Sequence, residues 1–253
     1  MKEAHRIKPG AEPYRAEGGP LGVLLVHGFT GSPASLRPMA EFLASKGLTV
    51  ELPRLPGHGT HWEDLTDSSW EDWFEATENA FQDLAARSRD VVVVALSMGG
   101  SLAIHLAATH PYRVRGLALI NPYVVDPRLA GAVVLRLFTR SRKGVVNDIK
   151  KPGQDEVGYE RMPVKILPSL AKLLKTAQQD LPNVHAPLLY FRSSEDHVVS
   201  PSSVKSVMAK IGSKDKELVE LHNSYHVATL DHEADLIEQR VLEFARSHAS
   251  ADA

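Results

Sequence analysis

The chain has 253 residues, 43% of them hydrophobic and 24% charged, so it can bury one sizeable core. Its 29 basic and 31 acidic residues leave a formal net charge of -2, which gives no indication of a nucleic-acid partner. It has no cysteine, which excludes disulfides, thiolate metal sites and a cysteine nucleophile.

The first 20 residues are polar and rich in glycine, proline and glutamate. They contain no apolar stretch of signal-peptide length, and no later run has the length of a membrane span. We therefore expect a cytoplasmic protein without stable membrane insertion. The sequence gives no indication of its oligomeric state.

Strand and helix patterns alternate along the first half of the chain. Residues 90–96 are almost entirely apolar and include four consecutive valines, which favours a strand buried on both faces. We expect further strands at 21–26, 48–52 and 114–120, and helices at 35–45, at 69–87 with Ser69 as cap, and from residue 98 to the His110-Pro111 pair. This alternation predicts an α/β fold with a mostly parallel sheet and helices on both faces.

The pattern changes between residues 123 and 185. No strong strand is expected there, and an apolar helical piece at 129–138, a basic polar stretch at 139–151 and an amphipathic helix at 164–177 follow one another. We interpret 123–185 as a helical cap, or lid, inserted into one domain that spans residues 1–253. Strands are expected again at 187–191 and 217–221, with helices starting at Ser200 as cap and at 233.

The stretch Ala95-Leu96-Ser97-Met98-Gly99 passes from the apolar strand into a helix. It matches the nucleophile elbow G-x-S-x-G except that alanine replaces the first glycine. Such an elbow exposes its serine at the carboxyl end of a strand, where reactive groups gather in α/β sheets. The alternative is a serine that only caps the helix.

A base and an acid for such a serine should come from loops that follow strands. The loop after 217–221 contains His222 and His226, and the loop after 187–191 contains Glu195 and Asp196. The order serine, carboxylate, histidine is that of the α/β hydrolases. His226 is favoured over His222 because its loop is long enough to fold back over the elbow.

Five motifs together give the chain a family resemblance. They are Leu25-Val26-His27-Gly28-Phe29-Thr30-Gly31-Ser32, Arg54-Leu55-Pro56-Gly57-His58-Gly59, Leu96-Ser97-Met98-Gly99-Gly100, Glu195-Asp196-His197-Val198-Val199 and Asn223-Ser224-Tyr225-His226-Val227-Ala228-Thr229-Leu230-Asp231. The chain resembles the bacterial carboxylesterases of the α/β-hydrolase fold, most closely the bacterial monoacylglycerol lipases. The resemblance implies Ser97 as nucleophile, Asp196 as acid and His226 as base, with the backbone N–H groups of Phe29 and Met98 as oxyanion hole.

The activity implied is hydrolysis of carboxyl esters, either monoacylglycerols or other short- to medium-chain acyl esters, with no cofactor and no metal. The partner expected is therefore a small-molecule ester. An acyltransferase or thioesterase using the same residues is the alternative, and a non-catalytic binding protein is disfavoured by the complete set. The cluster His58, His61, Glu63 and Asp64 matches no metal-ligand spacing.

The inserted segment should decide the substrate, since the resemblance implies a cap between the sixth and seventh strands of the family's sheet. We expect its apolar side chains to line a tunnel for an acyl chain, although they could simply pack the cap on the body. These side chains are Val133, Val134, Leu135, Leu137, Phe138, Ile166, Leu167, Leu170, Leu173 and Leu174. Glu156 is a candidate to hydrogen-bond an alcohol such as glycerol. Arg136, Arg140, Arg142 and Lys143 are expected to form a solvated face.

Overall fold

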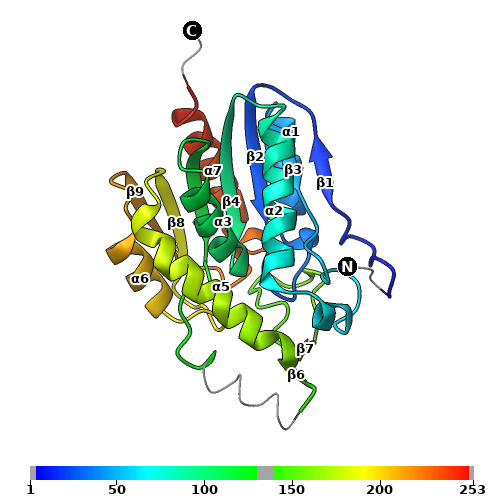
Figure 1. Ribbon diagram of the computed structural model, residues 1–253. Helices are drawn as coiled ribbons and strands as arrows, with labels where there is room; N and C mark the ends of the chain where they lie inside the picture. The colour runs from blue at the N-terminus through cyan, green and yellow to red at the C-terminus, as the bar shows by residue number, and fades with distance from the viewer. Residues whose placement is uncertain (1–3, 130–138, 251–253) are drawn as a thin grey trace.

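A mostly parallel seven-stranded sheet runs through the protein, whose computed structural model describes residues 4–129 and 139–250 (Figure 1). Its strand order is β1-β3-β2-β4-β5-β8-β9, and only β1 is antiparallel to its neighbour. The strands are β1 (Tyr14–Ala16), β2 (Leu21–Val26), β3 (Thr49–Leu52), β4 (Asp90–Leu96), β5 (Val114–Ile120), β8 (Leu188–Ser193) and β9 (Lys216–Leu221). The predicted α/β architecture is confirmed.

Helices cover both faces of this sheet, as predicted. Alternate residues of β2 point to opposite sides, so that Leu24 packs into one core and Leu25 into the other. On one face lie α2 (Trp70–Ala85), α3 (Met98–Thr109), α5 (Leu167–Asp180) and α6 (Ser202–Lys210), and on the other lie α1 (Arg37–Ser45) and α7 (Ala234–Ser247). Figure 1 shows α2 and α5 in front of the sheet and α7 behind it.

Local signals fix several helix ends. The predicted cap Ser69 begins α2 in a capping box: its Oγ accepts a hydrogen bond from Asp72 N–H, and its own N–H donates to the Asp72 carboxylate. At α6 the predicted boundary is wrong by one residue, since Pro201 occupies the cap position. Pro201 already has helical dihedrals (φ -54, ψ -13), and Ser200 Oγ accepts the N–H of Ser202 as a cap would.

The segment between β5 and β8 contains two strands that the sequence pattern did not reveal. β6 (Ser141–Lys143) and β7 (Arg161–Pro163) form a two-stranded antiparallel sheet. Each has three residues, too few to show an alternating pattern. The segment lies between the fifth and sixth strands of this sheet.

Helix α5 lies next to this small sheet and packs against α3. Four leucines on it, Leu167, Leu170, Leu173 and Leu174, are buried as their spacing predicts. The apolar positions Val133, Val134, Leu135, Leu137 and Phe138, together with Arg136, lie outside the described residues. Among the helices of the described ranges, none combines the length and the apolar character needed to cross a bilayer.

Candidate active site

Ser97 stands at the sharp turn between β4 and α3. Its backbone has φ 55 and ψ -122, a conformation that residues with a side chain rarely adopt, and its N–H donates to the carbonyl of Ile120 at 3.0 Å. A side chain at Gly99 would collide with the carbonyl oxygen of Val26, so the glycine allows α3 to approach β2 closely. This is the strand, turn and helix geometry of a nucleophile elbow.

Two backbone regions approach Ser97 from neighbouring elements. Met98 is the first residue of α3, so its N–H has no acceptor within the helix. The loop after β2 is close as well, because a Cβ added to Gly28 would lie 3.0 Å from the Cβ of Ser97. Phe29 follows Gly28 in this loop and lines the same cavity as Ser97.

His27 is fully buried and supports the loop that follows β2. Its Nδ1–H donates to the carbonyl of Gly28 at 3.0 Å, and its Nε2 accepts the N–H of Leu55 at 3.1 Å. Burial lowers the pKa of His27 to about 4, so the ring is neutral at pH 7 and suits both bonds. Its contacts are those of a supporting residue.

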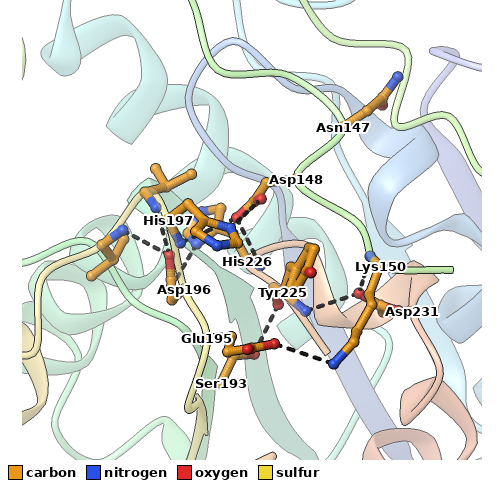
Figure 2. Close-up of polar contacts among 12 residues, drawn as sticks. Asn147, Asp148, Lys150, Ser193, Glu195, Asp196, His197, Tyr225, His226 and Asp231 are labelled. Carbon is orange, nitrogen blue, oxygen red and sulfur yellow. Dashed lines mark hydrogen bonds and ion pairs between the residues drawn. The ribbon is translucent and has the colours of Figure 1, made fainter. Parts of the chain in front are cut away.

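Asp196 and His226 form a buried pair at the carboxyl ends of β8 and β9. His226 Nδ1–H donates to Asp196 Oδ2 at 2.9 Å, and Asp196 Oδ1 accepts the N–H groups of Val198 and Val199 at 2.8 Å each (Figure 2). Both side chains are less than a tenth exposed, at 7% for His226 and 8% for Asp196.

Each partner shifts the pKa of the other. Burial lowers the pKa of His226, but the charge and hydrogen bond of Asp196, with smaller contributions from Glu156 and Asp148, raise it above its ordinary value. Burial likewise raises the pKa of Asp196, yet His226 and the two N–H donors hold it below its usual range. Asp196 is therefore ionised at neutral pH.

The two competing candidates point elsewhere. Glu195 is exposed and forms an ion pair with Lys150 at 3.2 Å. His222 is exposed, and its backbone N–H donates to Glu233. Of the two carboxylates and two histidines considered, only Asp196 and His226 are hydrogen-bonded to each other in the structure.

Ser97 and His226 line one cavity of about 330 Å³. Apolar side chains make much of its wall, including Phe29, Met162 and Leu170. Among the described residues no hydrogen bond joins Ser97 Oγ to His226. In enzymes without bound substrate this contact is often long.

Glu156 also lines this cavity and is 9% exposed. Its Oε1 accepts the N–H of Asn147 at 2.7 Å, and its own N–H donates to Asn147 Oδ1 at 2.9 Å. Burial raises the pKa of Glu156 above its ordinary value. The oxygens of a carboxylate can accept hydrogen bonds from the hydroxyl groups of an alcohol.

The sequence analysis missed Asn121, which follows β5 with φ 43. Its Nδ2 donates to Ser193 Oγ at 2.9 Å and to the carbonyl of His226 at 2.8 Å, and its Oδ1 accepts the N–H of Ser193 at 2.8 Å. It thus joins the ends of β5 and β8 to the loop of His226. The signal was an asparagine before proline at a strand end.

The cluster His58, His61, Glu63 and Asp64 does not converge on one point. His58 is fully buried, and Asp64 Oδ1 lies 3.0 Å from Nδ1 of His5. In the described ranges, one group of three residues, His5, His61 and Glu63, offers ligand atoms within 4.8 Å of one another. None of these residues lines the cavity of Ser97.

Comparison with known proteins identifies the family of the chain. The family model described as "Serine aminopeptidase, S33" matches residues 21–233. The chain belongs to this family. It is 44% identical to the thermostable monoacylglycerol lipase of Bacillus sp. (strain H-257), over 98% of this chain and 100% of the relative. It is 27% identical to a carboxylesterase of Bacillus subtilis (strain 168), over 92% and 95% of the two chains.

A solved structure supports the same assignment. A metagenome-derived lipolytic enzyme superposes with a TM-score of 0.92 at 40% identity, covering 96% of this chain and 100% of the other. The α/β-hydrolase fold and the predicted family resemblance are therefore confirmed. The chain is a serine hydrolase whose named relatives hydrolyse carboxyl esters.

Proposed function

We propose that this protein hydrolyses monoacylglycerols and related short- to medium-chain esters through an acyl-enzyme on Ser97. The observation that carries the proposal is that Ser97 lines one cavity with His226, whose ring is hydrogen-bonded to the buried Asp196. The similarity to a named monoacylglycerol lipase supports the substrate class.

The first step forms the acyl-enzyme. His226 Nε2 takes the proton of Ser97 Oγ as that oxygen bonds to the ester carbonyl carbon, and Asp196 stabilises the imidazolium. The negative charge moves to the carbonyl oxygen, where the N–H groups of Phe29 and Met98 stabilise it. The carbon–oxygen bond to the alcohol then breaks, and the leaving alcohol takes the proton from His226.

The second step regenerates the enzyme. A water molecule gives a proton to His226 and attacks the acyl carbon, and the tetrahedral intermediate collapses to release the carboxylic acid. The proton returns from His226 to Ser97 Oγ. An alcohol in place of water would give acyl transfer by the same route, so product partitioning separates a hydrolase from a transferase.

In this proposal residues 123–185 cap the cavity and hold the acyl chain. Met162, Leu167 and Leu170 of this segment contribute apolar side chains to the lining of the cavity. Glu156 hydrogen-bonds the glycerol hydroxyls of a monoacylglycerol, with its buried carboxyl facing the same space.

The test compares 1-monoacylglycerol with p-nitrophenyl esters from acetate to palmitate, for wild type, Ser97→Ala and Glu156→Gln. We expect Ser97→Ala to lose hydrolysis of every substrate. Glu156→Gln should raise KM for monoacylglycerol by roughly tenfold and leave p-nitrophenyl esters within about twofold, because only glycerol needs its hydrogen bond.

Two results would contradict the proposal. Wild type that hydrolyses p-nitrophenyl esters but not monoacylglycerol would rule out the lipid substrate and keep the esterase. Wild type that cleaves acyl thioesters much faster than oxygen esters would favour the thioesterase alternative.

A further inference from the structure

Asp148 brings a charge from the segment between β5 and β8 to the two loops that carry Asp196 and His226. Its side chain is only 11% exposed and lines the cavity of Ser97. Figure 2 draws its contacts with both loops. No sequence motif pointed to it.

The Asp148 carboxylate accepts three hydrogen bonds. Oδ2 accepts the backbone N–H of His226 at 3.2 Å and that of His197 at 3.3 Å. Oδ1 accepts the Nδ1–H of the His197 ring at 2.8 Å. One side chain therefore joins residue 226 to residue 197, the residue next to Asp196.

Asp148 is itself held in place by its neighbours along the chain. Its carbonyl accepts the N–H of Val227 at 3.1 Å. Lys150 lies two residues after Asp148, and its backbone N–H donates to the Asp231 carboxylate at 2.7 Å. The same carboxylate accepts the N–H of Tyr225, the residue before His226, at 2.9 Å. The segment around Asp148 is thus fastened to both sides of His226, so its carboxylate is a fixed point for the two loops.

We infer that Asp148 is a positioning residue for catalysis, which fixes the loops of Asp196 and His226 relative to each other so that the His226 ring stays aligned with Ser97. The inference rests on the proposed function. Asp148 exchanges no proton with substrate in this role and acts through His226. A displacement of a catalytic group by about 1 Å can cost roughly a hundredfold in rate, so loss of this contact should be measurable.

The negative charge of Asp148 adds a readout that packing alone would not give. The carboxylates that raise the pKa of His226 are Asp196, Glu156 and Asp148. His197 is cationic when protonated, and its hydrogen bond to Asp148 is the largest of the contributions that raise its pKa. With Asp148 neutralised, the imidazolium form of His226 loses one stabilising charge, so its pKa falls.

Two variants separate alignment from charge. Asp148→Ala removes all three acceptor contacts, whereas the amide oxygen introduced by Asp148→Asn can still accept both backbone N–H groups. Asp155→Ala is the matched control, because Asp155 is an exposed carboxylate of the same segment that accepts the N–H of Val157. The substrate is p-nitrophenyl acetate, whose acyl group is too short to depend on an acyl tunnel.

We expect Asp148→Ala to lower kcat roughly ten- to a hundredfold with KM changed by less than about threefold, while Asp155→Ala matches wild type. Asp148→Asn should recover most of kcat, and the acid limb of its kcat/KM profile should move to lower pH. If Asp148→Ala fails to fold, the pH of the acid limb of kcat/KM in Asp148→Asn is the measurement that tests the inference.

The inference is overturned if Asp148→Ala keeps wild-type kcat, or if Asp148→Asn keeps the wild-type acid limb, while Ser97→Ala is inactive. Activity that persists in Ser97→Ala would instead overturn the proposed function and this inference with it. The Ser97→Ala arm therefore tells the two failures apart.

Discussion

The backbone of Ser97 has a positive φ that favours glycine, although the proposed chemistry needs a hydroxyl there. Its φ of 55 and ψ of -122 are held by the fixed ends of β4 and α3. A conformation of this kind stores of the order of 1–3 kcal/mol for a residue with a Cβ.

Replacement of Ser97 should therefore separate stability from activity. We expect the free energy of unfolding of Ser97→Gly to exceed that of Ser97→Ala by about 1 kcal/mol, since glycine adopts this conformation without strain. Both variants should lack esterase activity. Chemical denaturation of the two variants measures the difference, and equal stabilities would show that the turn is not strained.

In the proposed mechanism, the protonation state of His226 sets the pH dependence of catalysis. Its pKa is raised above its ordinary value, mainly by Asp196 once burial is offset. Only the neutral ring accepts the Ser97 proton, so kcat/KM should rise with pH through a limb above the ordinary imidazole value of about 6.5.

Asp196→Asn should move this limb to lower pH, because the imidazolium form of His226 loses the charge that stabilises it. It should also lower kcat by roughly ten-thousandfold, because the asparagine no longer holds the His226 ring in the required tautomer. A pH series of kcat/KM for wild type and variant measures both effects. A limb that stays in place in Asp196→Asn would assign it to another group.

Among the elements, α5 combines two tasks on one helix. Leu167 and Leu170 line the cavity, whereas Leu173 and Leu174 are buried in the core without lining it. Their spacing predicted an apolar face, but which leucines meet the cavity depends on how the helix packs against α3.

Leu170→Ala and Leu174→Ala form a matched pair for this element. Both should lower the free energy of unfolding by about 2–5 kcal/mol, since each deletes a buried leucine side chain. Only Leu170→Ala should raise KM for longer p-nitrophenyl esters, by roughly tenfold relative to acetate, because it removes apolar contact with the acyl chain. The same chain-length profile in both variants would contradict the assignment of Leu170 to the acyl site.

At the scale of the whole molecule, the sequence predicted those helices and strands whose apolar residues recur at regular spacing. The valine-rich β4 and the amphipathic α2 are recognisable from their apolar spacing, and the loops at the strand ends contain Ser97, Asp196 and His226. Strand β1 was not predicted because it has three residues at the edge of the sheet, with pairing decided by β3.

Long-range contacts of single side chains were also beyond the sequence pattern. Asp148 meets His226 across 78 residues, and Asn121 reaches the same loop across 105. Asp148 has no periodic or motif signature, and the Asn121-Pro122 pair marks a strand end without indicating its contact, since each contact depends on loops that only the folded sheet brings together. The choice of Asp196 over Glu195 relied on family resemblance, because adjacent carboxylates on one loop look alike in sequence.

The central claim is that Ser97 is the nucleophile activated by His226, and covalent labelling tests it most directly. Wild type, Ser97→Ala and His226→Ala would be treated with a fluorophosphonate and followed by intact mass and peptide mapping. We expect one adduct per wild-type chain, located on Ser97, no adduct in Ser97→Ala, and labelling slowed at least roughly a thousandfold in His226→Ala. An adduct on another residue, or undiminished labelling of Ser97→Ala, would contradict the account.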